Sequence, residues 1–181
     1  VYMDITAPLY WWKEFDTYKV GTVRNSCSTM HKIHEKEFAL DDFSFEHLIP
    51  VTSEGDVDED LITMRVKGSD ANSSYAFMEQ CVWYLNYWRE KYLEAKTKPM
   101  KDNSKRAEVM KKYWWQMIQL LPSSYNQKRT ITMNYENVCS IIQQRSGHML
   151  DEWQDFVAVL KKLPYVQEIM EGSEGDETDK R

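Results

Sequence analysis

A short run of small polar residues follows the first apolar segment of the chain. It contains Arg24, Asn25, Ser26 and Ser28. Backbone N–H groups and small hydroxyl or amide side chains can converge on a phosphate without steric hindrance, and an arginine adds a positive charge. The run therefore indicates an anion-binding loop, although a polar turn without a ligand has the same composition.

A second pair of candidate residues, Asn134 and Arg145, lies nearer the C-terminus. The planar fork of an arginine can hold a phosphate or the edge of a pyrimidine with two hydrogen bonds. Both residues also have a structural explanation. Asn134 precedes an apolar helical pattern and suits its N-cap, and an arginine at a helix C-terminus is favoured by the helix dipole.

The segments from Ala7-Pro8-Leu9-Tyr10 to Ser26-Cys27-Ser28 and from Leu121-Pro122 to Arg145 resemble, in spacing, the two ligand-binding segments of the flavin-dependent thymidylate synthases. The resemblance implies roles for individual residues. The implied nucleotide-binding residues are Ser26 and Arg145, with Arg24, Asn25 and Ser28 as additional donors, and the implied flavin-side residues are Asn134 and His148.

That family implies an α/β (α+β) fold in which a small sheet is flanked by long helices. It also implies a homotetramer whose sites are shared between subunits, which the many aromatic residues of this chain would suit. The implied reaction is the reductive methylation of dUMP to dTMP, a methyltransferase activity that uses FAD, NADPH and methylenetetrahydrofolate. In such chemistry the protein mainly binds and orients the ligands.

The sequence also departs from the family at several positions. Asp16-Thr17-Tyr18 stands where the family has Arg-His-Arg, and Ile118 stands where it has a phosphate-binding arginine. The family's N-terminal portion, which carries a flavin-contacting histidine, is expected to be missing before Ala7. These departures support an alternative, a non-catalytic protein that senses or sequesters a nucleotide in an inter-subunit pocket. A third hypothesis is a structural or interaction protein without a pocket.

Composition limits the class of protein. The 181 residues suit one domain over residues 1–170, followed by an acidic, disordered tail over residues 171–181. A net charge of −6 argues against binding to a nucleic acid polymer. The sequence has no apolar run of membrane-spanning length. Three widely spaced cysteines favour free thiols in a reducing compartment, and the sequence therefore predicts a cytoplasmic protein.

Two weaker signals concern metal or nucleophile chemistry. His31 and His34 have a spacing that can share a metal on one helix face, but no third ligand is evident and a solvated face is the favoured interpretation. Cys27 lies in the polar run without an identifiable base. The sequence therefore predicts neither a metal site nor a catalytic nucleophile.

The apolar pattern predicts the elements that would position these residues. The expected strands cover residues 3–6, 61–66 and 130–133, and the expected helices cover residues 8–20, a short stretch within 36–50, 74–95, 109–121, 134–144 and 149–162. Loops are expected at residues 22–30, 51–60 and 96–104.

Overall fold

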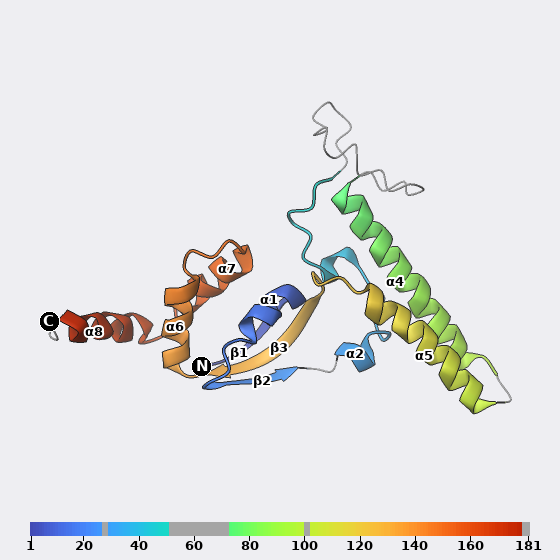
Figure 1. Cartoon of the computed structure of the whole chain (residues 1–181), viewed down its shortest axis with the longest axis horizontal. Helices are drawn as coiled ribbons and strands as arrows, with labels where there is room; N and C mark the ends of the chain where they lie inside the picture. The colour runs from blue at the N-terminus through green and yellow to red at the C-terminus, as the bar shows by residue number, and fades with distance from the viewer. Residues whose placement is uncertain (27–28, 51–72, 100–101, 179–181) are drawn as a thin grey trace, which may run out of the picture. The chain divides into compact units, whose positions relative to one another are not determined.

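The computed structural model describes residues 1–26, 29–50, 73–99 and 102–178 of the chain. These residues form a mixed α+β structure with a small antiparallel sheet (Figure 1). The elements are β1 Tyr2–Pro8, α1 Leu9–Phe15, β2 Thr22–Ser26, α2 Thr29–Lys32, the 3₁₀ turn η1 Leu40–Asp42, α4 Ser74–Thr97, α5 Asn103–Leu120, β3 Asn126–Met133, α6 Tyr135–Arg145, α7 Asp151–Leu160 and α8 Val166–Thr178.

The chain divides into two compact units. Unit 1 comprises Val1–Cys27 and Gln127–Arg181, and unit 2 comprises Ser28–Asn126. The sequence predicts a single domain over residues 1–170. In the structure, unit 2 is inserted between two strands of unit 1 and has a hydrophobic core of its own.

The sheet of unit 1 has the order β1-β3-β2. Val1 and Met133 exchange two main-chain hydrogen bonds of 2.7 and 2.8 Å, which fixes the antiparallel register of β1 on β3. Met3 and Ile5 are half-buried while the alternate residues Tyr2, Asp4 and Thr6 are exposed, so one face of β1 lies on the core. The predicted strands at residues 3–6 and 130–133 are confirmed, with longer bounds.

Two helices with apolar residues at three-and-four spacing complete the core of unit 1. Asn134 is the N-cap of α6, because its side chain accepts a hydrogen bond from the N–H of Asn137 at 2.9 Å. The predicted cap and the predicted helices at residues 134–144 and 149–162 are thus confirmed within a few residues. The most deeply buried side chains of this core include Trp11, Trp12, Phe15, Ile131, Val138, Ile141, Trp153 and Leu160.

The polar run that the sequence predicts as a loop is a strand over Thr22–Ser26. β2 pairs with β3 in an antiparallel register that places Arg24 opposite Ile131 and Ser26 opposite Arg129. In β2 the half-buried positions carry Thr22 and Arg24, whereas Val23 is 65% exposed. The usual apolar-inward alternation is therefore inverted, and the loop prediction is wrong because the strand lacks the pattern that identifies one.

The helix after β1 is shorter than the predicted one. α1 ends at Phe15, and Asp16 and Thr17, which have low helix propensity, begin the connection to β2. The connection ends at Gly21, whose φ is +66°, a conformation that favours glycine. Gly21 therefore belongs to the turn into β2 and does not cap the helix.

We expect Gly21→Ala to lower the free energy of unfolding by about 1–2 kcal/mol. A Cβ at this position would lie 2.8 Å from the side-chain nitrogens of both Asn134 and Asn137, in addition to the strain of the positive φ. Urea denaturation followed by circular dichroism measures the change. Gly147→Ala is the matched control, because its Cβ would meet nothing within 4 Å and its expected effect is below about 0.5 kcal/mol. Equal effects of the two substitutions would contradict the role of Gly21.

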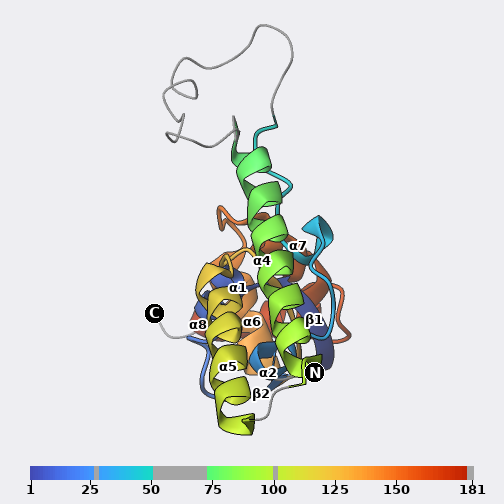
Figure 2. The ribbon, with the colours of Figure 1, turned by 90° about the vertical axis from the view of Figure 1, so that its right-hand side faces the viewer.

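Unit 2 is built on two long helices that run side by side, as Figures 1 and 2 show. α4 begins at a serine cap, in which the Ser73 hydroxyl accepts from the N–H of Ala76, and α5 begins at Asp102, whose carboxylate accepts from two main-chain N–H groups. The predicted helices at residues 74–95 and 109–121 are confirmed. Their shared core contains Met78, Leu85 and Met117.

Residues 36–50 contain only the short turn η1, so the helical prediction for this segment is wrong. Asn86 on α4 provides the reason. Its side-chain amide accepts from the N–H of Phe38 and donates to the C=O of Phe38, both at 2.8 Å, and thereby binds the main-chain groups that a helix would use internally. Phe38 and Phe43 are buried against α4 and α5. The predicted loop at residues 51–60 and strand at residues 61–66 lie outside the described residues.

The last helix, α8, runs through Thr178. It includes part of the segment 171–181 that the sequence predicts as a disordered tail. Val166 is 1% exposed and Met170 packs against the core of unit 1, so these residues anchor the beginning of the helix. Helical hydrogen bonds then continue beyond this anchored part of the helix.

Candidate functional site

Three of the predicted nucleotide-binding residues of the polar run, Arg24, Asn25 and Ser26, lie on an edge strand. Arg24 is half-buried, and Asn25 is exposed on the alternate face of β2. Ser26 ends the strand, and Ser28 lies outside the described residues. An edge strand directs its side chains alternately to two faces, so Arg24 and Asn25 do not point to one ligand. Of these residues, the structure places Arg24 among other charged groups.

Arg145, the last residue of α6, binds Glu14 of α1. Its Nη1 donates to Glu14 Oε2 at 2.8 Å. The same oxygen accepts from Trp153 Nε1 at 3.0 Å and lies 3.3 Å from His148 Nε2. The His148 Nδ1 accepts from the N–H of Leu150, which places the proton of a neutral imidazole on Nε2, facing the carboxylate. One carboxylate oxygen thus accepts two hydrogen bonds and has the His148 imidazole as a third close neighbour.

A second carboxylate of the same segment, Asp16, binds two more arginines. Arg24 Nη1 donates to Asp16 Oδ1 at 2.9 Å, and Arg129 Nη1 lies 3.1 and 3.2 Å from the two oxygens. Arg129 comes from β3 and also donates from Nε to the side chain of Gln127 at 2.7 Å. This pairing joins β2 and β3 to the end of α1.

Tyr18 connects the two groups. Arg24 Nη2 donates to its main-chain carbonyl, and Arg145 Nε donates to its hydroxyl at 3.0 Å. The hydroxyl in turn donates to Gln144 Oε1 at 3.0 Å. Arg24, Arg129 and Arg145 are therefore gathered around the C-terminal end of α1, and we refer to these three residues as the arginine cluster.

Aromatic rings support each member of the arginine cluster. The guanidinium carbon of Arg129 lies 4.6 Å from the centroid of the Trp12 ring, and that of Arg145 lies 4.5 Å from the centroid of the Trp153 ring. The guanidinium carbon of Arg24 lies 5.7 Å from the centroid of the Phe15 ring. The three arginine side chains are 17–21% exposed, so each guanidinium is fixed yet reachable from solvent. The Arg24 Nε atom is buried and has no hydrogen-bond partner among the described residues.

The electrostatic balance of this site is positive. In the described part of the chain, the three guanidinium groups of the arginine cluster form ion pairs with two carboxylates, those of Glu14 and Asp16. Guanidinium groups bind carboxylate and phosphate oxygens with the same fork geometry. The arrangement can therefore hold an anion by exchanging one of these carboxylates for a phosphate, and it can equally act as a set of internal ion pairs.

The predicted flavin-side residues do not come together within one chain. Asn134 lies at the start of α6 and His148 beyond its end. The helix has 11 residues, so these ends are about 16 Å apart at 1.5 Å per residue. The Asn134 side chain is engaged in capping and also lies near Gly21, while His148 faces Glu14. These residues do not fit a flavin held by a single subunit.

Sequence reasoning missed the acidic partners Glu14 and Asp16, as well as Arg129 and the indole of Trp153. One signal was available for Asp16. It stands where the resembled family has an arginine, and Arg24 stands where that family has an acid, so the two charges are exchanged together. In this chain the two residues form an ion pair of 2.9 Å.

The other positions considered from sequence lie in unit 2. Ile118 packs against the core of that unit. His31 is exposed, and His34 packs on Tyr92 with ring centroids 4.6 Å apart. Burial is the main cause that lowers the pKa of His34, with a further contribution from Lys96. No group of three or more His, Cys, Asp or Glu side chains within residues 1–26, 29–50, 73–99 and 102–178 could hold a metal ion.

Comparison with protein-family models, with curated proteins and with solved structures finds no match for this chain. The resemblance to flavin-dependent thymidylate synthases therefore stays a prediction. Across the described residues, every helix is too short or too polar to cross a lipid bilayer.

Proposed function

We propose that this chain is a nucleotide-binding protein that holds the phosphate of its ligand at the arginine cluster. The observation that carries the proposal is the convergence of Arg24, Arg129 and Arg145 from β2, β3 and α6 on the end of α1. These three arginines are far apart in sequence but meet at one short segment. Their combined positive charge exceeds the negative charge of the carboxylates Glu14 and Asp16 with which they pair.

A nucleotide suits this site better than a bare anion because the arginines are bordered by aromatic rings. Tyr18 lies beside Arg145, with the guanidinium carbon 5.7 Å from its ring, and its hydroxyl is already a hydrogen-bond acceptor. A flat base can stack on a ring of this kind while its phosphate meets the guanidiniums. The ligand class is thus a mononucleotide, for which dUMP is the first candidate because of the family resemblance.

Two observations favour the non-catalytic version of this function. The guanidinium of Arg145 is already bound to Glu14, although the resemblance implies that Arg145 binds the substrate. Asn134 and His148 lie at opposite ends of α6, so one chain does not assemble the flavin-side residues. The FAD-dependent methylation of dUMP to dTMP, with NADPH and methylenetetrahydrofolate, remains the alternative if a second subunit completes the flavin site.

Thermal unfolding with single nucleotides tests the proposal. dUMP, UMP and dTMP are each added at a large excess, with inorganic phosphate and uridine as controls for the two halves of the ligand. Ligand at a hundredfold excess over Kd stabilises the native state by about 2.7 kcal/mol. A rise in Tm with a mononucleotide and not with uridine supports the site, and unchanged Tm with every nucleotide contradicts it. Flavin absorbance of the purified protein, or its recovery after addition of FAD, would favour the catalytic version.

We also infer that the protein is a homo-oligomer, for which the tetramer of the resembled family is the specific expectation. The supporting observation is an aromatic face on α4, formed by Phe77, Trp83, Tyr84 and Tyr87, whose side chains are 37–60% exposed. Trp83 stacks on Tyr87 with ring centroids 5.7 Å apart and meets Tyr84 edge-on at 4.9 Å, so these three rings form one contiguous group. Aromatic residues exposed together on one helix are typical of subunit contacts.

We expect Trp83→Lys to shift the protein from oligomer to smaller species at equal concentration, because a lysine brings an unpaired charge into the contact. Sedimentation velocity over a range of concentrations measures the shift. Glu108→Gln on α5 is the control, since Glu108 is exposed and the substitution changes the net charge by the same amount. A monomeric unsubstituted protein, or equal behaviour of both variants, would refute the aromatic face as a contact.

A further inference from the structure

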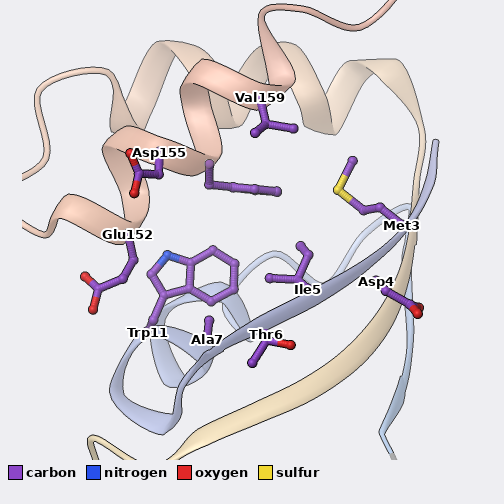
Figure 3. A pocket seen from close by; sticks show the side chains of 10 residues that line it. Met3, Asp4, Ile5, Thr6, Ala7, Trp11, Glu152, Asp155 and Val159 are labelled. Atoms are coloured by element: carbon purple, nitrogen blue, oxygen red, sulfur yellow. The ribbon is translucent and has the colours of Figure 1, made fainter. Parts of the chain in front are cut away.

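An open cavity lies between the edge strand β1 and helix α7 in unit 1 (Figure 3). No residue of the arginine cluster lines it. It has a volume of about 400 Å³. Its floor is apolar and consists of Met3, Ile5, Trp11, Phe156 and Val159. The size is within the range of ligand-binding pockets, and an apolar floor of this kind favours an apolar group.

The free edge of β1 borders this cavity. Five consecutive residues from Met3 to Ala7 line it, although their side chains alternate between the two faces of the sheet. In the described part of the chain, β1 has β3 as its single neighbour. Because Val1 and Met133 form a hydrogen-bonded pair, the antiparallel ladder directs the main-chain groups of Asp4 and Thr6 away from β3. Those groups are placed to pair with an added strand.

A buried polar atom of the floor lacks a partner. The Trp11 side chain is 1% exposed, and its Nε1–H donates to no acceptor among the described residues. Figure 3 shows the pyrrole edge of Trp11 turned toward α7 and its six-membered ring toward Ile5. A buried N–H without an acceptor costs about 1–3 kcal/mol, which an occupant with an acceptor group would recover.

The far wall of the cavity is acidic. Glu152 and Asp155 lie on the face of α7 that borders the cavity, and Glu152 accepts a hydrogen bond from the Tyr10 hydroxyl. Asp4 contributes little to this wall, because its carboxylate binds Lys128 and Thr130 at 2.8 and 2.6 Å, and Figure 3 shows it directed away from Trp11. An occupant that carries positive charge beside its apolar group fits this wall.

We propose that β1 and α7 form a docking site for an extended basic peptide of a partner protein, which pairs with β1 as an additional strand. One side chain of the peptide enters the cavity and provides an acceptor for Trp11 Nε1, for which the tyrosine hydroxyl is suited. Lysine or arginine residues two positions away on the same face of the peptide meet Asp155 and Glu152. Strand addition uses main-chain hydrogen bonds for affinity and pockets for specificity.

Charge argues against a second copy of this chain as the occupant. The sequence of β1, Tyr2–Pro8, contains Asp4 and no lysine or arginine. Pairing of β1 with its symmetry mate would therefore place no basic residue of the strand opposite Glu152 and Asp155 on α7. A basic segment of another protein supplies the complementary charge.

A synthetic peptide library tests the proposal before the partner is identified. The probes are acetylated and amidated heptapeptides of the form Thr-X-Thr-X-Thr-X-Thr, in which the three X positions share one face of a strand. We expect the strongest binders to carry Tyr at the central X and Lys or Arg at the flanking ones. In amide exchange by NMR, the N–H groups of Asp4 and Thr6 should exchange rapidly in the free protein and at least tenfold more slowly with the best peptide bound.

Matched variants distinguish binding at the docking site from nonspecific binding of peptide to the protein. Val159→Lys places a charge against the cavity, whereas Ala158→Lys adds the same charge at an exposed position of α7 that does not line it. We expect at least tenfold weaker peptide binding for Val159→Lys and for Thr6→Pro, which removes an outward N–H, and less than twofold change for Ala158→Lys. The proposal is overturned if no peptide binds, if the variants bind equally, or if Asp4 and Thr6 already exchange slowly because the edge is covered by a second copy.

Discussion

Replacing Trp153 with alanine is expected to lower the free energy of unfolding by about 4 kcal/mol, a loss typical of a large side chain removed from a packed core. The side chain is fully buried, and its ring lies 4.7 Å from Trp11 and about 6 Å from Phe15 and Phe156. Truncation removes these contacts together with the hydrogen bond from Nε1 to Glu14. Urea denaturation followed by near-ultraviolet circular dichroism measures the loss.

Trp153→Phe separates packing from hydrogen bonding. Phenylalanine keeps most of the ring contacts but cannot donate to Glu14, so we expect a loss of about 2 kcal/mol, in the range of a hydrogen bond to a charged group. A change below about 1 kcal/mol for Trp153→Ala would show that the aromatic core of unit 1 is not arranged around this ring.

Replacing Arg145 with alanine is expected to weaken nucleotide binding by roughly a hundredfold, because the guanidinium is the member of the arginine cluster that borders both Tyr18 and Trp153. The same substitution leaves Glu14 with His148 and Trp153 as its remaining partners and should destabilise the fold by about 2 kcal/mol. Isothermal titration with dUMP, at a temperature well below the Tm of the variant, measures the binding change.

Glu14→Gln distinguishes an anion site from a purely structural ion pair. If phosphate competes with the Glu14 carboxylate for Arg145, removal of the negative charge should strengthen nucleotide binding by about tenfold. If the pair only supports the fold, both Arg145→Ala and Glu14→Gln should reduce stability without any change in ligand affinity. That second result, in a protein that does bind a nucleotide, would exclude Arg145 as a ligand.

The elements that sequence predicts best are the helices in which buried apolar residues recur every three or four positions. α4, α5, α6 and α7 each carry apolar residues at helical spacing. The predicted bounds of α4, α6 and α7 agree closely with the structure, whereas α5 begins at Asn103 and not at residue 109. β2 could not be found in this way, because its half-buried side chain is an arginine and its exposed one is a valine. The segment around Phe38 was missed for another reason, since Asn86 on a distant helix supplies its main-chain hydrogen bonds.

The candidate site could be predicted only in part. Arg24 follows from its residue type in a polar run and Arg145 from the family resemblance, and the structure places both at the end of α1. Their partners do not follow, because an ion pair such as Arg145 with Glu14 joins residues far apart in sequence and depends on the packing of α6 against α1. Sequence shows which charges exist, whereas the tertiary fold decides which of them meet.

The insertion of unit 2 between β2 and β3 has a consequence for how the chain folds. Ser26 lies opposite Arg129 in the ladder, although roughly one hundred residues separate them, so closing this pair carries the entropy cost of a long loop. The helical hairpin of α4 and α5 forms from local contacts, which assemble quickly. Compaction of unit 2 would shorten the effective chain distance between β2 and β3. We therefore expect the β2–β3 pairing to form late in folding, at a rate set by the folding of unit 2.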